Sequence, residues 1–162
     1  RFLYVSWARR CVLETGVLVV GMDSLLTQLA RCCKPAPPDE IRGFVTRGKG
    51  VSIHRGNCPN FRELVSRSPE RVIDVQWATG SANLPAFYPV DIAVEAVDRQ
   101  GLLRDISEVF SKESMNVIGV QTSTVKGIAW MTFTVEVTHS GRLAHVLSVV
   151  GRIAGVRHAR RQ

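Results

Sequence analysis

The chain has 162 residues, of which 45% are hydrophobic and 22% are charged. This balance is typical of a globular protein, because a disordered chain carries too few apolar residues to offset the entropy lost on folding. The length predicts one domain or two small ones. No apolar run approaches the ~18 residues that a transmembrane helix needs, and we therefore expect no membrane contact.

Basic residues outnumber acidic ones, with 21 Lys and Arg against 14 Asp and Glu, for a formal net charge of +7. A moderate basic excess favours polyanionic partners, although a solvated surface explains it almost as well. We expect no secretory signal, because Glu14 and Gly16 interrupt the candidate apolar segment. The expected location is therefore cytoplasmic and reducing, so that cysteines are thiols or metal ligands. The sequence contains four: Cys11, Cys32, Cys33 and Cys58.

Residues 78–88 divide the chain. They are rich in small, turn-forming residues, include Pro85, and show neither a helical nor a strand period. We predict that they link a module at residues 17–77 to a second domain at residues 89–162. Residues 1–16 are left as an unassigned N-terminal segment.

The module is predicted to be a small, cysteine-containing α+β unit. Three prolines between residues 34 and 39 forbid a helix interior there. In chain order we expect a strand at 17–20, a helical turn or two at 25–29, an extended loop at 34–39, hairpin strands at 41–46 and 51–54, a helix that starts at Cys58-Pro59 with Asn57 as its cap, and one strand at 72–77.

The second domain has clearer patterns. Apolar residues alternate with polar ones at residues 90–97 and again at 129–137, which indicates half-buried strands. Apolar positions recur at helical spacing from 102 to 110 and from 143 to 153. With strands at 117–125 and 156–160, the order is βαββαβ, a ferredoxin-like fold.

Two cysteines precede the predicted hairpin, and a histidine and a cysteine follow it four positions apart. One imidazole and three thiolates would complete a tetrahedral zinc site. Adjacent cysteines can both bind only where the backbone is irregular, which the neighbouring prolines permit. The alternative is that they are reduced thiols packed as small hydrophobic groups. The candidate ligands are Cys32, Cys33, His54 and Cys58.

A cluster of basic residues covers the same module, where nine bases oppose four acids between residues 31 and 71. Arg47-Gly48-Lys49-Gly50 is predicted to be a glycine-rich hairpin tip at which the backbone approaches phosphates between two cations. We expect Arg55, on or near this hairpin, to be exposed with them. An exposed charged loop without a partner is the alternative.

Catalytic motifs are absent from the sequence. Gly16 and Gly21 have the spacing of a phosphate-binding loop, but Met22-Asp23 replaces its lysine and hydroxyl residue. In the second domain, residues 98–102 join the first strand to the first helix, where free backbone N–H groups could bind a carboxylate. Most such turns bind nothing.

Several motifs of the module closely resemble the conserved-cysteine region of long RelA/SpoT homologues, the alarmone enzymes that pyrophosphorylate GTP or GDP using ATP. Residues 89–162, with Asp98-Arg99-Gln100-Gly101-Leu102-Leu103, resemble the ACT domain that ends those proteins. The motifs of the module are Leu29-Ala30-Arg31-Cys32-Cys33-Lys34-Pro35, Asp39-Glu40-Ile41, Thr46-Arg47-Gly48-Lys49-Gly50-Val51-Ser52-Ile53-His54-Arg55 and Asn57-Cys58-Pro59.

The resemblance implies the regulatory C-terminal part of a stringent-response (p)ppGpp synthetase, a GTP pyrophosphokinase, whose catalytic region lies elsewhere in the parent chain. In ribosome-associated members the cysteine region is called a zinc finger, with ligands at Cys32, Cys33, His54 and Cys58. It contacts ribosomal RNA beside an uncharged tRNA, which gives the basic cluster a partner. The expected RNA contacts are Arg31, Lys34, Arg47, Lys49 and Arg55.

ACT domains elsewhere bind amino acids at a paired interface built from the first turn and helix. Carried over to this chain, the resemblance implies ligand binding at Asp98, Gly101 and Leu102. An amino-acid-sensing dimer that relays occupancy to the distant catalytic region of the parent chain is thus the alternative function.

Overall fold

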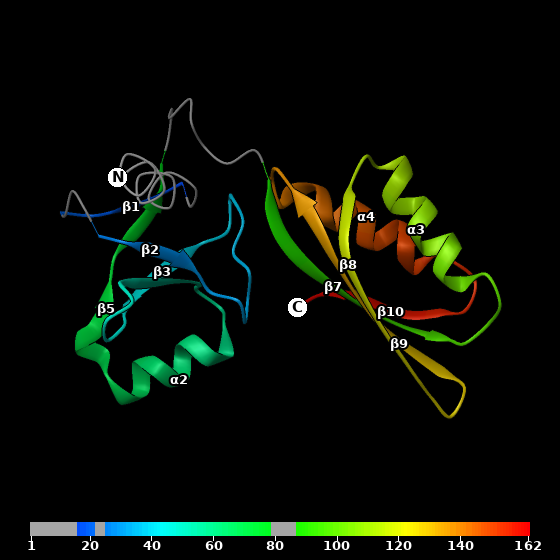
Figure 1. The fold of residues 1–162 in the computed structure, drawn as a ribbon, viewed down its shortest axis with the longest axis horizontal. Helices are drawn as coiled ribbons and strands as arrows, with labels where there is room; N and C mark the ends of the chain where they lie inside the picture. Colours follow the sequence, from blue (N-terminus) through cyan, green and yellow to red (C-terminus); the bar gives the residue numbers. More distant parts are fainter. Residues whose placement is uncertain (1–15, 22–24, 79–86) are drawn as a thin grey trace, which may run out of the picture. The chain divides into compact units, whose positions relative to one another are not determined.

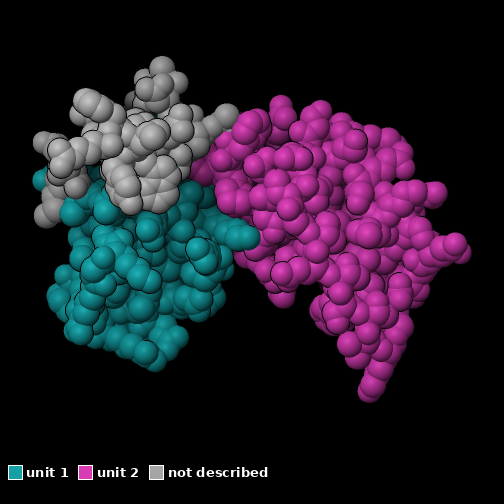
Figure 2. All heavy atoms as spheres, in the orientation of Figure 1, with its two compact units in different colours: residues 1–86 teal, residues 87–162 magenta. Residues whose placement is uncertain are grey.

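The computed structural model describes residues 16–21, 25–78 and 87–162. The chain divides into two compact units, residues 1–86 and residues 87–162, which Figure 2 draws in separate colours. Nearly all of the unassigned segment 1–16 and most of the predicted linker lie outside the described residues. No described helix is long and apolar enough to cross a bilayer.

The described part of the first unit contains a four-stranded sheet, a separate two-stranded pair and one α-helix (Figure 1). The sheet has the strand order β2-β4-β3-β5, in which β2 and β4 are parallel and the other neighbours are antiparallel. Its elements are β1 (Val17–Val19), β2 (Thr27–Leu29), β3 (Ile41–Val45), β4 (Val51–Arg55), α2 (Pro59–Arg67), a 3-10 turn η1 (Pro69–Arg71), β5 (Val72–Ile73) and β6 (Val75–Trp77).

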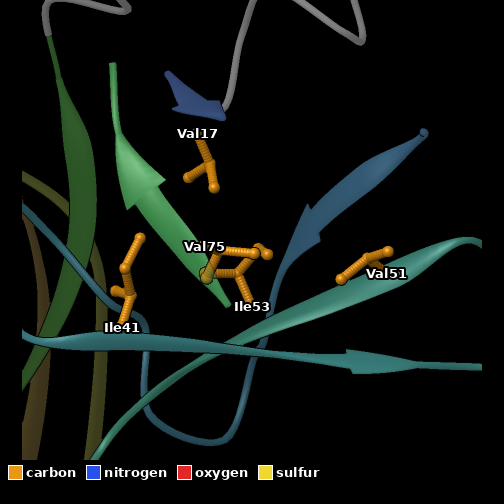
Figure 3. Close-up of a cluster of buried hydrophobic side chains, with 5 residues drawn as sticks. All are labelled: Val17, Ile41, Val51, Ile53 and Val75. Carbon is orange, nitrogen blue, oxygen red and sulfur yellow. The ribbon is translucent and has the colours of Figure 1, made fainter. Parts of the chain in front are cut away.

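Two small hydrophobic clusters lie among the described residues of this unit. The first gathers between β1, β3, β4 and β6, as Figure 3 shows, and contains Val17, Ile41, Val51, Ile53 and Val75. The second lies under α2 and contains Ala30, Cys33, Phe44, Cys58 and Phe61. Two of the candidate metal ligands are therefore also core residues.

The predicted helical turn at residues 25–29 is wrong, because residues 27–29 form β2. Its three leucines fit a helical stripe, but the parallel partner β4 determines the structure. The N–H of Val51 donates to the carbonyl of Leu26, and the N–H of Ala30 donates to the carbonyl of Ile53, each at 2.8 Å. These bonds pair the backbone with the sheet, which a single isolated helical turn cannot match.

Two further predictions for this unit are corrected. The segment 72–77 is two strands, since β5 pairs with β3 whereas β6 pairs with β1, and the chain passes between the sheets at Asp74. The cap of α2 is Cys58 and not Asn57. Pro59 occupies the first helical position, where its missing N–H costs nothing, and this places the cap one residue later than predicted.

The second unit is a four-stranded antiparallel sheet with two helices on one face (Figure 1). The strand order β10-β7-β9-β8 confirms the predicted βαββαβ topology. The elements are β7 (Tyr88–Val97), α3 (Leu102–Lys112), β8 (Asn116–Val125), β9 (Ile128–Val137), α4 (Gly141–Gly151) and β10 (Val156–Arg161).

The core of this unit follows the alternation seen in the sequence. Every second residue of β7 and β9 is buried, and the helices contribute Ile106 and Phe110, whose ring lies 5.2 Å from that of Phe133. Tyr88, assigned to the linker by prediction, begins β7 because its ring is buried opposite Val137. A tight turn at Lys126-Gly127 joins β8 to β9.

Candidate metal centre and basic hairpin

The four candidate ligands come together in the first unit. Their ligand atoms, three sulfurs and one ring nitrogen, all lie within 4.8 Å of one another. Cys32 and Cys33 lie in the turn after β2, His54 is on β4, and Cys58 immediately precedes α2. Segments separated by more than twenty residues thus supply one cluster.

Three of the separations between these atoms fit a tetrahedral metal site. With bonds of about 2.3 Å to sulfur and about 2.0 Å to nitrogen, such a site places sulfurs about 3.8 Å apart and each sulfur about 3.5 Å from the nitrogen. The Sγ atoms of Cys32 and Cys58 are 3.7 Å apart. The Nδ1 atom of His54 is 3.5 Å from Cys32 Sγ and 3.9 Å from Cys33 Sγ.

An irregular backbone allows two adjacent cysteines to face the same point. Residues 31–33 form a turn closed by a hydrogen bond from the N–H of Lys34 to the carbonyl of Ala30, at 3.0 Å. Lys34 itself has a positive φ of 39°. Neighbouring side chains on a regular strand would point to opposite faces. The turn provides the irregular backbone that two adjacent cysteines need in order to bind one metal ion.

Neighbouring groups orient the cluster. The Nε2 atom of His54 lies 3.0 Å from Ser52 Oγ, which leaves Nδ1 directed at the sulfurs. The backbone N–H of Arg55 donates to Cys33 Sγ at 3.4 Å. The imidazole also packs against Phe61, with ring centroids 5.6 Å apart. Such outer contacts fix the ring and its tautomer in metal sites.

Burial shifts the protonation of the cluster. It lowers the pKa of His54, which favours the neutral imidazole that binds metals. It raises the pKa of Cys32, and that of Cys33 to about 12. Burial also acts to raise the pKa of Cys58, but hydrogen bonds, first from the N–H of Phe61, outweigh it and leave that pKa lowered. A bound cation would stabilise all three thiolates.

The basic hairpin tip is the second candidate site. Arg47 and Lys49 are exposed between β3 and β4. The loop is closed at its base, where the N–H and hydroxyl of Thr46 donate to the carbonyl of Gly50 at 2.8 and 2.7 Å. A side chain at Gly48 would meet nothing within 4 Å, so the backbone there is open to approach.

The remaining predicted RNA contacts do not share this tip. Arg31 is exposed in the turn beside the cysteines, and Lys34 is half-buried. Arg55 is half-buried at the opposite end of β4, where it lines a hollow of about 180 Å³ together with Asp39 and Glu40. The expectation that Arg55 is exposed at the tip is therefore wrong, and two carboxylates beside it would repel a phosphate.

The predicted ligand turn of the second unit has a defined conformation. Gly101 caps α3 with a φ of 81°, which a residue with a side chain rarely adopts. Asp98 is exposed, whereas Leu102 is buried in the core. Arg99 ties the turn down by donating to Asp105 Oδ2 at 2.7 Å and to the carbonyl of Ala154 at 2.9 Å.

Comparison with known proteins agrees with both units. Residues 17–78 match the model of the RelA/SpoT RIS domain, and residues 85–161 match that of the ACT domain. The chain contains a RelA/SpoT RIS domain followed by an ACT domain. The resemblance seen in the motifs is thereby confirmed.

Curated relatives place the two domains in longer proteins. The chain is 43% identical to a GTP pyrophosphokinase of Streptomyces coelicolor over 91% of its own length and 17% of the relative's. It is 40% identical to a GTP pyrophosphokinase of Escherichia coli over 90% of its length and 19% of the relative's. The chain thus spans about a fifth of these relatives.

The ACT domain of a GTP pyrophosphokinase from Chlorobium tepidum aligns with 48% of this chain and 88% of its own, at 19% identity and a TM-score of 0.43.

Sequence reasoning missed two residues that position these sites. Ser52 contacts His54 in the RIS domain, and its place two residues earlier on a strand was a usable signal, since such residues share a face. Arg99 in the ACT domain donates to Asp105 and also to the carbonyl of Ala154, which lies 55 residues later in the chain. No local pattern indicates that second contact.

Proposed function

We propose that this chain is the regulatory C-terminal part of a stringent-response GTP pyrophosphokinase. In this proposal the RIS domain contacts ribosomal RNA beside an uncharged tRNA in the cytoplasm. The signal from this contact is relayed to a catalytic region elsewhere in the parent chain. Support comes from the relatives, which are GTP pyrophosphokinases about five times longer than the chain.

The hairpin tip carries the RNA part of the proposal. Among the described residues, neither Arg47 nor Lys49 has an ion-pair partner, so their charges are available to a ligand. Both cations lie on one turn, which hydrogen bonds from Thr46 to Gly50 close at its base. Cations flanking an open glycine backbone suit the phosphates of RNA, which position a protein without reading its sequence.

We also propose that Cys32, Cys33, His54 and Cys58 hold a structural zinc ion. Bound there, zinc would contribute folding free energy to a unit whose described core contains two five-residue clusters of buried side chains. The donor set fits, because three sulfurs and one neutral imidazole nitrogen at near-tetrahedral separations are typical of closed zinc sites. The metal would fix the turn after β2 to β4 and to α2.

The RNA proposal is tested by co-sedimentation of the 162-residue chain with ribosomes across a salt series. Each phosphate contact contributes about 0.7 to 0.9 to the slope of log affinity against log salt. Arg47→Ala with Lys49→Ala should weaken binding and flatten that slope by about one and a half units. The control, Arg62→Ala with Arg67→Ala on α2, removes the same charge from exposed positions and should retain the slope.

Wild-type affinity and slope in the hairpin variant would show that the tip is only a solvated surface. Equal losses in both variants would indicate a general charge effect without a defined contact. Only a selective loss at the tip supports the proposal.

A second candidate function is amino-acid sensing by an ACT dimer. The observation in its favour is Gly101, whose left-handed conformation opens the eleven-residue helix α3 beside the exposed Asp98. The buried side chain of Leu102 could take part only through its backbone. Calorimetry with the twenty amino acids, combined with light scattering, tests it: no heat and no dimer would exclude the sensor.

A further inference from the structure

The cysteine cluster is unevenly covered. Cys33, His54 and Cys58 are buried, with 3%, 5% and 1% of their surface exposed. Cys32 is exposed to solvent. A reagent in solution can therefore reach the cluster at one sulfur while the others remain behind the fold.

The exposed sulfur also has one well-placed partner. Cys32 Sγ lies 3.7 Å from Cys58 Sγ, and a disulfide requires about 2.05 Å. Both residues lie outside regular elements, since Cys32 is in a turn and Cys58 is the cap of α2. An approach of about 1.7 Å is thus possible without breaking a strand or a helix.

Cys33 is the poorer partner for either residue. Its sulfur accepts a hydrogen bond from the backbone N–H of Arg55, which ties it to strand β4. A bond between Cys32 and Cys33 would close a small ring across one peptide bond, which departs from the usual disulfide geometry. The positions of the three sulfurs therefore favour a Cys32–Cys58 disulfide over the Cys32–Cys33 and Cys33–Cys58 pairings.

We propose that Cys32 and Cys58 are an oxidisable pair, through which a hydroperoxide opens the cluster and releases its metal. The pairing rests on the positions of the two sulfurs alone, whereas the metal release rests on the proposed zinc site. The domain would then hold zinc only in its reduced state and would lose it reversibly on oxidation.

The chemistry needs one named oxidant and balances in two steps. The Cys32 thiolate attacks one oxygen of the hydroperoxide, which breaks the O–O bond, forms a sulfenic acid and releases hydroxide or alkoxide. The Cys58 thiolate then attacks the Cys32 sulfur, forms the disulfide and expels the second hydroxide. Two protons from solvent neutralise the two leaving groups. Two ligands are thereby lost, and Cys33 and His54 alone do not complete a tetrahedral site.

Oxidation should also loosen the fold around α2. Cys33 and Cys58 share their buried cluster with Phe61, which packs against the His54 ring. Movement of Cys58 toward Cys32 displaces the start of α2 from that cluster. We therefore expect faster hydrogen exchange in α2 and in the turn after β2, with no change in the ACT domain.

The experiment uses the 162-residue chain carrying Cys11→Ser, so that no fourth thiol competes. The protein is treated with hydrogen peroxide, trapped with N-ethylmaleimide and mapped by mass spectrometry, while a chromogenic chelator reports released zinc. We expect the Cys32–Cys58 disulfide to exceed the other two pairings by at least tenfold, with zinc release at the same rate. Dithiothreitol and added zinc should restore the starting state.

Variants and controls make the outcome decisive. Cys32→Ser should slow disulfide formation at least tenfold, whereas Cys33→Ser should retain the Cys32–Cys58 bond. If either variant fails to fold, the protein with all three cysteines of the cluster still provides a test. Brief pulses of N-ethylmaleimide should label its Cys32 at least tenfold faster than Cys33 or Cys58. Equal labelling, or a mixture of pairings, would overturn the proposal.

Failure of the redox pair is distinguishable from failure of the zinc site. If the purified protein contains no zinc but still forms the Cys32–Cys58 disulfide, the zinc proposal fails and the redox pair stands. If the protein contains zinc but forms no such disulfide under peroxide, the redox pair fails and the zinc proposal stands.

Discussion

Removing metal from the RIS domain should unfold that domain and leave the ACT domain intact. Two of the proposed ligands, Cys33 and Cys58, are core residues of the cluster beneath α2, and a third, His54, packs against Phe61 in the same cluster. Loss of the ion would place unpaired thiols and a free imidazole in half of a small core. The ACT domain has its own core and none of the ligands.

The expected loss of stability follows from the linkage between metal binding and folding. A ligand present at a thousand times its dissociation constant stabilises the folded state by about 4 kcal/mol. In a domain of this size, 1 kcal/mol corresponds to about 4–8 °C in melting temperature, so chelation should lower the transition by about 16–32 °C. A single core in such a small unit rarely supplies more than about 3–5 kcal/mol. Chelation should thus remove most of the stability of the RIS domain.

The assay is hydrogen exchange with peptide-level mass spectrometry, which reads each domain separately. With a chelator present, β3, β4 and α2 should lose protection while β7 and β9 retain it. His54→Ala should reproduce the effect, whereas His158→Ala, an exposed histidine on β10, should not. Unchanged protection of β3 and β4 under chelation would refute the reasoning and identify the cysteines as packing groups.

Three further predictions concern single residues. Ser52→Ala should weaken metal affinity 10–100-fold, about 1.4–2.8 kcal/mol, because the His54 ring loses the partner of its Nε2 atom; zinc competition titration measures this. Gly43→Ala should lower the free energy of unfolding of the RIS domain by about 1–3 kcal/mol, because the new Cβ would lie 2.8 Å from Ile73 Cγ1. The control is Gly119→Ala, whose Cβ would lie 3.6 Å from Thr134 and should change the free energy of unfolding of the ACT domain by less than about 0.5 kcal/mol. Urea unfolding measures both. Hydrogen bonds from Arg99 and then Arg104 lower the pKa of Asp105, so its carboxylate stabilises the fold above its unfolded pKa of about 3.9, and this contribution disappears as the pH falls through the lower folded value. Asp105→Asn should therefore cost stability at neutral pH and approach wild type in acid; a difference that does not depend on pH would contradict this.

The ACT domain was predictable from its sequence because local and tertiary preferences agree. Alternation in β7 and β9 matches burial residue by residue, and Lys126-Gly127 supplies the positive φ angles, 50° and 77°, that a tight hairpin turn requires. Tyr88 was missed because an aromatic residue between two prolines carries no period of its own. Its burial depends on β9, forty-nine positions later.

The RIS domain was predictable only in part, because its short strands depend on partners distant in sequence. Residues 27–29 become a strand through β4, and residues 72–77 divide at Asp74 because two different sheets lie on either side. The candidate cysteine and histidine ligands could be selected by type and spacing. Their convergence could not, since it requires the turn at residues 31–33 to bring Cys32 and Cys33 to one point.

The same reasoning explains the error at Arg55. A count of charges near a hairpin does not distinguish its tip from its base, and only the pairing of Arg55 with Ile41 shows that it lies at the base. Arg47 and Lys49 were placed correctly because Gly48 and Gly50 mark the turn itself. Gly50 is required there, since a side chain would overlap the backbone of Leu26.

The most direct measurement of the central claim is a photo-crosslink from the hairpin tip to the ribosome. A photoreactive amino acid at position 49 of the 162-residue chain, irradiated on ribosomes that hold an uncharged tRNA, reports what lies within reach of Lys49. The control is the same residue at position 67, on the exposed face of α2. The account predicts crosslinks from position 49 to a defined segment of ribosomal RNA and few from position 67. Crosslinks from position 49 to ribosomal proteins only, or none above the control, would contradict it.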